Sequence, residues 1–310
     1  MAPFSKNNSS REPVGLDVDS GYVAAVQASG GRIAAGASMD LPNGLVVEGE
    51  VADVDGLAGA LKDFFKQNGL PRSVRLGVAN QQVAVRELEL PRIDDEADLA
   101  AAIRFKAEEA VPMPLAEAVL DHQVIGQGTN FEGTATTQVM VVAARQGMVE
   151  RLADAVRGAG LRPQGIDLNA FALVRLLADP SAPEDQARVY CHLAGVANLA
   201  VAVSSTCLFT RTLSVVPAAE PELAAAQLAE EIQPSIDYYL GQPGAKLVGD
   251  VVLSGPGAAT GGLADALSPL LGLPVSVANP LGTLNRVGLP PGEDPQRHTI
   301  AAGLALGAAS

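Results

Sequence analysis

Aromatic and basic residues are scarce in this sequence. It contains no tryptophan, and the aromatic residues together make up 4% of its 310 residues. Bases of a nucleic acid therefore have few side chains on which to stack. The 21 Lys and Arg residues are outnumbered by 35 Asp and Glu, and the formal net charge of −14 at pH 7 repels a phosphate backbone. We therefore expect no nucleic-acid partner and no membrane binding through a basic patch.

Long apolar runs and cysteine clusters are also absent. No run approaches the roughly 20 apolar residues of a membrane-spanning helix, so direct membrane insertion is not expected. Met1–Pro13 lacks the apolar core of a signal peptide, and we predict a disordered tail there. Cys191 and Cys207 lie in apolar strand-like runs, which favours buried free thiols in a reducing cytoplasm. Because no further ligands stand at metal spacing, these cysteines predict no zinc site.

The first informative stretch is Val14–Gln27. An apolar run containing Asp17 is followed by the turn Asp19-Ser20-Gly21 and by a second apolar run, which predicts a β-hairpin. Backbone N–H groups in such a turn can bind the phosphates of a nucleotide, and the carboxylate of Asp17 can hold a metal ion through water. The same residues suit an ordinary turn, so the hairpin alone leaves both interpretations open.

The strand pattern of this hairpin occurs twice. A third strand is predicted at Arg32–Met39, and three similar strands separated by short turns follow at Arg188–His192, Asn198–Val203 and Cys207–Leu213. Two halves with the same strand order predict a duplicated α/β fold with a ligand cleft between them. We expect one domain at residues 14–180 and a second at 181–310. The other predicted elements are helices at 54–67, 148–159, 169–178, 223–240, 263–271 and 299–309, and strands at 73–79, 83–90, 162–168, 250–253 and 275–278.

A distinctive segment, Pro91–Ile125, interrupts the first half. Asp94 or Asp95 can cap a helix, and the run Val111–Pro114 ends it. This helix carries apolar residues at helical spacing, among them Ile103 and Ala107. The pattern then predicts a strand at 118–125, a polar, glycine-rich loop at 126–136 and a buried strand at 137–144.

Several motifs, taken in chain order, resemble one protein family. They are GLDV from Gly15, LPRIDDEADLAAAIRFKAEEAVPMPLAEAVLDHQVI from Leu90, VMVVAARQ from Val139, AGLRPQGIDLNAFAL from Ala159, VVLSGPGAATGGL from Val251, ANPLG from Ala278 and AAGLALG from Ala301. This order resembles the PilM family, the actin-like, FtsA-related cytoplasmic proteins of bacterial type IV pilus assembly. The resemblance implies an actin-like α/β fold of two ribonuclease H-like domains. The long motif is its most specific part and implies an inserted subdomain, called 1C, at about residues 91–165.

The resemblance also implies ATP and Mg²⁺ as ligands of the cleft. In the first phosphate hairpin Gly15, Asp17 and Ser20 match the family pattern, with Asp17 as the metal residue and Ser20 and Gly21 beside the phosphates. Asp19 stands where relatives have glycine. Its carboxylate adds a repulsion to a triphosphate of about 1 kcal/mol at 4 Å in water. The lysine that relatives carry a few residues later is missing, so we expect weakened phosphate binding.

The second phosphate hairpin departs from the family pattern as well. Relatives commonly have Asp, an apolar residue and Gly, whereas this chain has His192-Leu193-Ala194-Gly195. A neutral imidazole is a poor magnesium ligand, and the alternative is that His192 is a hydrogen-bonded strand residue. We expect no catalytic residue, slow or absent hydrolysis, and ATP as a structural ligand at most. The further nucleotide contacts implied by the resemblance are Ala194, Gly195, Gly255, Pro256 and Gly257, together with Glu231 and Ser235, for which a solvated helix face is the alternative.

The implied partner is the N-terminal tail of a PilN-like inner-membrane protein, bound in a groove between subdomains 1A and 1C. The partner-binding candidates are Ile103, Arg104, Lys106 and Ala107, and a solvated helix face is again the alternative for the two basic residues. We expect a cytoplasmic adaptor held at the inner face of the membrane through its partner. The alternatives are an FtsA-like cell-division protein and an active actin-like ATPase, and self-association remains open.

Overall fold

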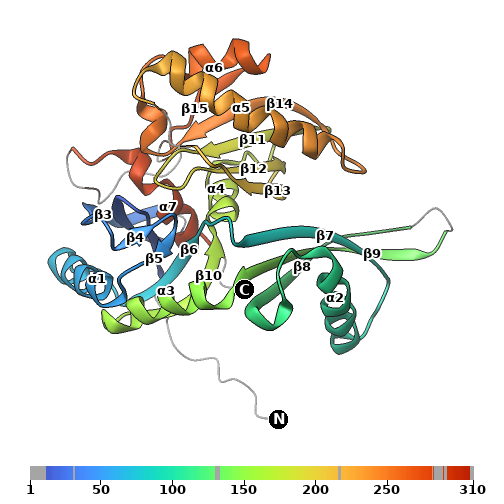
Figure 1. Ribbon diagram of the computed structural model, residues 1–310, viewed down its shortest axis with the longest axis horizontal. Helices are drawn as coiled ribbons and strands as arrows, with labels where there is room; N and C mark the ends of the chain where they lie inside the picture. Colours follow the sequence, from blue (N-terminus) through green and yellow to red (C-terminus); the bar gives the residue numbers. More distant parts are fainter. Residues whose placement is uncertain are drawn as a thin grey trace.

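The computed structural model describes residues 12–30, 32–129, 133–215, 218–280, 282, 289 and 292–307. Two five-stranded sheets lie one above the other, and a three-stranded sheet extends to one side of the lower one (Figure 1). The predicted tail Met1–Pro13 lies outside the described residues except for its last two positions. The predicted actin-like, two-domain α/β architecture is confirmed.

The first sheet contains the predicted meander and two parallel strands. Its strand order is β10-β6-β1-β2-β3, with β1 and β2 joined by the Asp19–Gly21 turn. A short pair, β4 and β5, lies beside it. The strands are β1 (Val14–Val18), β2 (Tyr22–Ser29), β3 (Arg32–Asp40), β4 (Val46–Val47), β5 (Glu50–Val51), β6 (Ser73–Val78) and β10 (Arg162–Leu168).

Two helices, α1 (Val54–Asn68) and α3 (Gln146–Gly158), pack their apolar residues into the core of the first sheet. The side chain of Asp53 accepts the N–H of Gly56 at 2.9 Å and caps the first turn of α1. Gly69 ends α1 with a φ of 61°, a conformation that glycine adopts at little cost. Local capping and apolar periodicity therefore explain why this helix begins and ends where the sequence predicts.

The second sheet repeats the first. Its order, β13-β12-β11-β14-β15, again places an antiparallel meander beside two parallel strands. Helices α5 and α6 supply apolar residues to its core. The elements are β11 (Gln186–His192), β12 (Asn198–Val203), β13 (Thr206–Thr212), α5 (Pro221–Leu240), β14 (Leu247–Ser254), η2 (Pro256–Ala259), α6 (Leu263–Leu271) and β15 (Val275–Val277).

Helices α4 (Asn169–Leu177) and α7 (Thr299–Ala305) lie between the two large sheets. They share a buried cluster with Tyr190, Ala200 and Ala202 of the second sheet. Helix α7 also packs against β1 and β2 of the first sheet. The C-terminal helix therefore joins the two halves, rather than belonging to the second domain alone as the boundary at residue 181 implied.

The three-stranded sheet, ordered β7-β9-β8, carries helix α2 on one face. Its elements are β7 (Val83–Pro91), α2 (Glu96–Ala110), η1 (Leu115–Glu117), β8 (Ala118–Thr129) and β9 (Ala135–Arg145). The side chain of Asp95 caps α2 by accepting the N–H groups of Ala97 and Asp98. This subdomain thus spans residues 83–145, whereas 91–165 was expected. The difference arises because β7 begins earlier, α3 packs on the first sheet and β10 pairs with β6 of that sheet.

The predicted loop at residues 126–136 is partly wrong. Strand β8 continues to Thr129, and Gly126 and Gly128 pair with Gln138 and Thr136 of β9. Most of β8 is exposed to solvent, so a polar strand costs little there. Gly126 and Gly128 therefore predict a loop from the local sequence, but their pairing with β9 keeps them in a strand. Residues 130–132, at the centre of the predicted loop, lie outside the described part of the chain.

Candidate functional site

Asp17 lies near the end of β1, just before the Asp19–Gly21 turn. It is 3% exposed, and the hydroxyl of Tyr22 donates to its Oδ2 at 3.4 Å. Burial, followed by the charge of Asp19, raises the pKa of Asp17 to about 8, and hydrogen bonds from Tyr22 and Asn169 oppose this shift. Asp17 is therefore mostly protonated at neutral pH.

The Asp19 carboxylate spans the cleft. Its Oδ1 accepts the N–H of Gly21 in its own turn at 3.2 Å and the N–H of Gly195, in the opposite hairpin, at 3.0 Å. A Cβ on Gly195 would overlap Asp19 Oδ1, so glycine is the residue that permits this approach. Burial raises the pKa of Asp19, while backbone hydrogen bonds, first from Gly21 and Gly195, oppose the rise. The two predicted phosphate hairpins are thus brought together, with a side-chain carboxylate between them.

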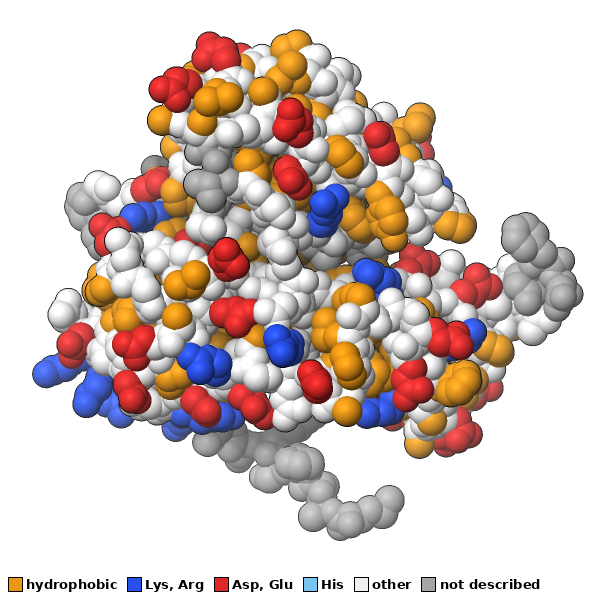
Figure 2. Space-filling view, viewed as in Figure 1, with side chains coloured by type: hydrophobic (Ala, Val, Ile, Leu, Met, Phe, Trp, Pro, Cys, Tyr) orange, Lys and Arg blue, Asp and Glu red, His pale blue; other side chains and the backbone are white. Residues whose placement is uncertain are grey.

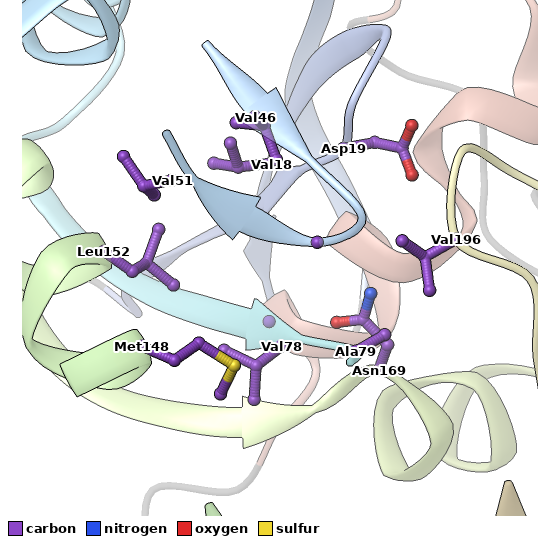
Figure 3. A pocket seen from close by; sticks show the side chains of 12 residues that line it. Val18, Asp19, Val46, Val51, Val78, Ala79, Met148, Leu152, Asn169 and Val196 are labelled. Atoms are coloured by element: carbon purple, nitrogen blue, oxygen red, sulfur yellow. The ribbon is translucent and has the colours of Figure 1, made fainter. Parts of the chain in front are cut away.

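A small cavity adjoins this contact (Figure 3). It has a volume of about 20 Å³, and Figure 3 shows Asp19 and Val196 above Asn169 at its edge. The Oδ1 of Asn169 and the Oγ of Ser20 are buried without a hydrogen-bond partner in the described part of the chain. A water molecule needs at least about 10–15 Å³ of such space, so the cavity accommodates water rather than a triphosphate.

Several polar groups of the second hairpin and of the Gly255–Gly257 turn are paired within the chain, whereas His192 Nε2 is buried without a hydrogen-bond partner among the described residues. His192 is buried, its Nδ1 lies 3.1 Å from Ser254 Oγ, and burial lowers its pKa to about 4. The N–H of Gly255 donates to Gln296 Oε1 at 2.9 Å, and the N–H of Gly257 donates to the carbonyl of Leu193 at 2.9 Å. His192 is therefore a neutral residue hydrogen-bonded in the cleft, and the donors of Gly255 and Gly257 are occupied.

Glu231 and Ser235 do not lie on a solvated helix face. Ser235 is fully buried and donates to the carbonyl of Glu231 at 2.8 Å. Arg211 on β13 donates to Ser235 Oγ at 3.4 Å, and its Nη2 lies 3.8 Å from Glu231 Oε2. Both residues are thus engaged by an arginine that the sequence analysis did not single out.

Comparison with known proteins identifies the family. A family model for type IV pilus assembly protein PilM matches residues 15–214. The chain belongs to this family. The solved structure of a PilM–PilN type IV pilus biogenesis complex is 25% identical with a TM-score of 0.78, covering 95% of this chain and 98% of that one. The resemblance seen in the sequence motifs is confirmed.

More distant structures share the fold of this PilM-family chain. Ethanolamine utilization protein EutJ from Carboxydothermus hydrogenoformans has a TM-score of 0.53 at 14% identity, covering 95% of this chain and 89% of that chain. A Bacteroides thetaiotaomicron protein with an actin-like ATPase fold has a TM-score of 0.50 at 10% identity, covering 90% of this chain and 95% of that chain. These matches support the actin-like architecture.

The nucleotide and metal implied by this architecture do not fit the residues of this PilM-family cleft as they are arranged. The hairpin donors are occupied, and the adjoining cavity is water-sized. Among the described residues, no group of three or more His, Cys, Asp or Glu side chains could hold a metal ion.

The predicted partner-binding residues of α2 fall on two different faces. Ile103 and Ala107 are 1% and 0% exposed and pack in the core of the three-stranded subdomain, so their side chains are unavailable to a partner. Arg104 and Lys106 are exposed on the outside of α2. Between them stands Phe105, which is 66% exposed and which the sequence analysis missed.

An exposed apolar strip lies between α2 and the start of β8. Pro112, Pro114 and Val119 are exposed there, and Met113 is half-buried. Strand β8 contacts α3 of the first domain, so this strip borders the junction of the two subdomains. Figure 2 shows hydrophobic side chains gathered near this junction, with charged side chains on both sides.

The segment around η3 (Pro295–His298) fastens the two halves at a second place. Gln296 donates to the carbonyl of Ala278 at 2.7 Å and accepts from Gly255, both in the second domain. The guanidinium of Arg297 lies 5.1 Å from the ring centre of Tyr22 in the first domain. No sequence motif predicts these contacts, because they join a turn-rich segment to residues far away in the chain.

Proposed function

We propose that this chain is an adaptor of the type IV pilus assembly platform that binds the N-terminal tail of a PilN-like inner-membrane protein. The observation that carries the proposal is a structural similarity. It covers 95% of this chain and relates it to a chain of a solved PilM–PilN type IV pilus biogenesis complex. The described helices include none that is long and apolar enough to cross a bilayer. We place the protein in the cytoplasm, held at the inner face of the membrane by its partner.

The apolar strip at the junction of the three-stranded subdomain and α3 is the surface we assign to the tail. Pro112, Pro114 and Val119 offer apolar contacts, and the prolines keep this stretch extended. An extended tail that buries one or two apolar side chains there would gain about 1.5–3 kcal/mol for each side chain fully buried. Arg104 and Lys106 lie on the neighbouring helix and can attract acidic residues of the tail.

Titration of the purified chain with a labelled peptide of the PilN-like tail tests the proposal. We expect Val119→Glu to weaken binding at least about tenfold, or 1.4 kcal/mol, because it places a carboxylate against an apolar tail. Val124→Glu is the matched control, since both valines lie on β8 and are 45% exposed, while Val124 is further from the junction. Fluorescence anisotropy gives both affinities.

The two possible failures have different meanings. If the tail does not bind at high micromolar concentration, the adaptor function is wrong. If it binds but Val119→Glu and Val124→Glu have equal effects, the adaptor function stands and the assigned surface is wrong. A Phe105→Ala variant would then show whether the outer face of α2 is the contact surface.

We infer that this adaptor is not an active ATPase. Hydrolysis of Mg-ATP needs a bound metal ion and a positioned water molecule. Asp17 is the carboxylate expected to hold the metal, and the N–H groups of Gly21, Gly195 and Gly255 that would hold the phosphates are paired with Asp19 and Gln296. A phosphate-release assay with Mg-ATP is expected to give no turnover above background, and turnover that Asp17→Ala abolishes would support the ATPase alternative.

A further inference from the structure

The hydrogen-bond donors of the cleft are already paired with groups of the chain itself. In phosphate-binding hairpins the backbone N–H groups point at the anion. Here the N–H groups of Gly21 and Gly195 point at Asp19 Oδ1, and those of Gly255 and Gly257 donate to Gln296 and Leu193. No donor among these four remains for a bound phosphate.

We infer that the carboxylate of Asp19 takes the place of a nucleotide phosphate as the anion that joins the two domains. It comes from the first hairpin, reaches the second, and accepts N–H groups from both, which is the bridging role that a phosphate has between two such turns. A hydrogen bond from a backbone N–H to a charged oxygen is roughly twice as strong as one between neutral groups. The cleft therefore closes on a side chain of the protein.

The space around Asp19 supports this inference. Val18, Asn169 and Val196 help to enclose the cavity of about 20 Å³ beside the carboxylate, which has room for water but not for a triphosphate (Figure 3). Gly195 is the position at which a side chain would block the contact. The pairing of Asp19 with Gly195 is thus complementary in charge and in shape.

The consequence is that domain closure does not depend on nucleotide. Asp19 holds the domains at the hairpins, and the η3 segment holds them through Gln296 and Arg297. In a cleft that closes on a nucleotide, removal of the ligand removes the bridging contacts. In this chain the bridging carboxylate is a side chain of the protein itself, so the domains keep their relative position when no nucleotide is bound. This inference goes beyond the adaptor function and does not require it.

Hydrogen exchange at the second hairpin tests the role of Asp19. In the Asp19→Ala variant we expect the Gly195 amide to exchange at least about tenfold faster, because its acceptor is lost. We also expect the melting temperature to fall by about 2–4 °C. Ser20→Ala is the matched control in the same turn, since Ser20 Oγ has no hydrogen-bond partner among the described residues, and it should leave both quantities unchanged.

Chemical rescue of the Asp19→Ala variant then tests whether a free anion can replace the missing carboxylate between the two hairpins. Inorganic phosphate should slow Gly195 exchange in Asp19→Ala and raise its melting temperature, and should do neither in the parent chain, with sodium chloride at equal ionic strength as the reference. If Asp19→Ala does not fold, Asp19→Asn replaces it, and a neutral acceptor should leave exchange intermediate between the parent and an unprotected amide. Unchanged Gly195 exchange in the variant, or micromolar binding of Mg-ATP to the parent by calorimetry, would overturn the inference.

Discussion

The Asp17→Asn variant is expected to lose most of the pH dependence of stability that the parent chain shows above pH 6.5. In the folded state the pKa of Asp17 is raised to about 8 by burial, whereas in the unfolded chain it returns to about 3.8. Between these values the folded state binds the proton and the unfolded state does not, so stability falls as pH rises. The slope is 1.36 kcal/mol per pH unit while the group is fully protonated and halves by pH 8, so the fall between pH 6.5 and 8 is about 1.6 kcal/mol.

This pH window separates Asp17 from the buried histidine of the opposite hairpin. The pKa of His192 is lowered to about 4, so its contribution to stability is lost as pH falls from its ordinary value of 6.5 towards 4. Above about pH 7.5 His192 is neutral in both states and contributes no slope, whereas at pH 6.5 the unfolded imidazole is half protonated and gives a small slope of opposite sign. Urea denaturation of the parent and of Asp17→Asn at pH 6.5 and 8 cancels the histidine contribution in the difference and isolates the carboxyl of Asp17.

Asparagine is the informative replacement because it keeps the size and an oxygen acceptor for Tyr22 but cannot ionise. At pH 8 it should make the chain more stable than the parent, and at pH 5 the two should be similar or the parent more stable. Asp63→Asn, at an exposed position of α1, controls for the change of net charge. Parallel pH profiles for parent and Asp17→Asn would show that Asp17 is ionised in the folded protein.

The repeated architecture could be predicted because its signals are local. Each meander has apolar alternation interrupted by short polar turns, and the α1 boundaries follow from Asp53 and Gly69. The β8–β9 hairpin was predicted too short because the exposed strand β8 needs no apolar residues, and Gly126 and Gly128 favour a loop in isolation. The pairing that keeps them in a strand comes from β9, which a local pattern does not include.

The site was predicted less completely because its chemistry depends on contacts across the cleft. The departure from the family pattern at Asp19 and His192 could be seen in the sequence, yet the sequence indicated only repulsion of phosphate. That Asp19 accepts the N–H of Gly195 follows from the way the two halves meet. Similarly, helical spacing placed Ile103 and Ala107 on one face of α2, but only the position of the three-stranded sheet shows that this face is the buried one.

The second large effect is expected at Gly303, where α7 crosses α4. A Cβ on Gly303 would overlap the backbone carbonyl of Ala172, which cannot swing aside as a side chain does. On its other side, α7 approaches β1 so closely that a Cβ on Gly15 would overlap the carbonyl of Ala301. Helix α7 is therefore confined between α4 on one side and β1 on the other. We expect Gly303→Ala to lower the free energy of unfolding by about 3 kcal/mol, at the upper end of the usual cost of overpacking.

The sign of this effect distinguishes close packing from helix propensity. In an open helical position Gly→Ala stabilises by up to about 1 kcal/mol, and Gly59, inside α1, has no atom within 4 Å of where its Cβ would stand. Gly59→Ala should therefore raise the urea midpoint while Gly303→Ala lowers it. Because α7 contributes Ile300 and Leu304 to the cluster shared by both domains, its displacement should also loosen the domain contact. Gly195 should then exchange faster in Gly303→Ala although Asp19 is unchanged, and a stabilised Gly303→Ala variant would show that α7 is not confined in this way.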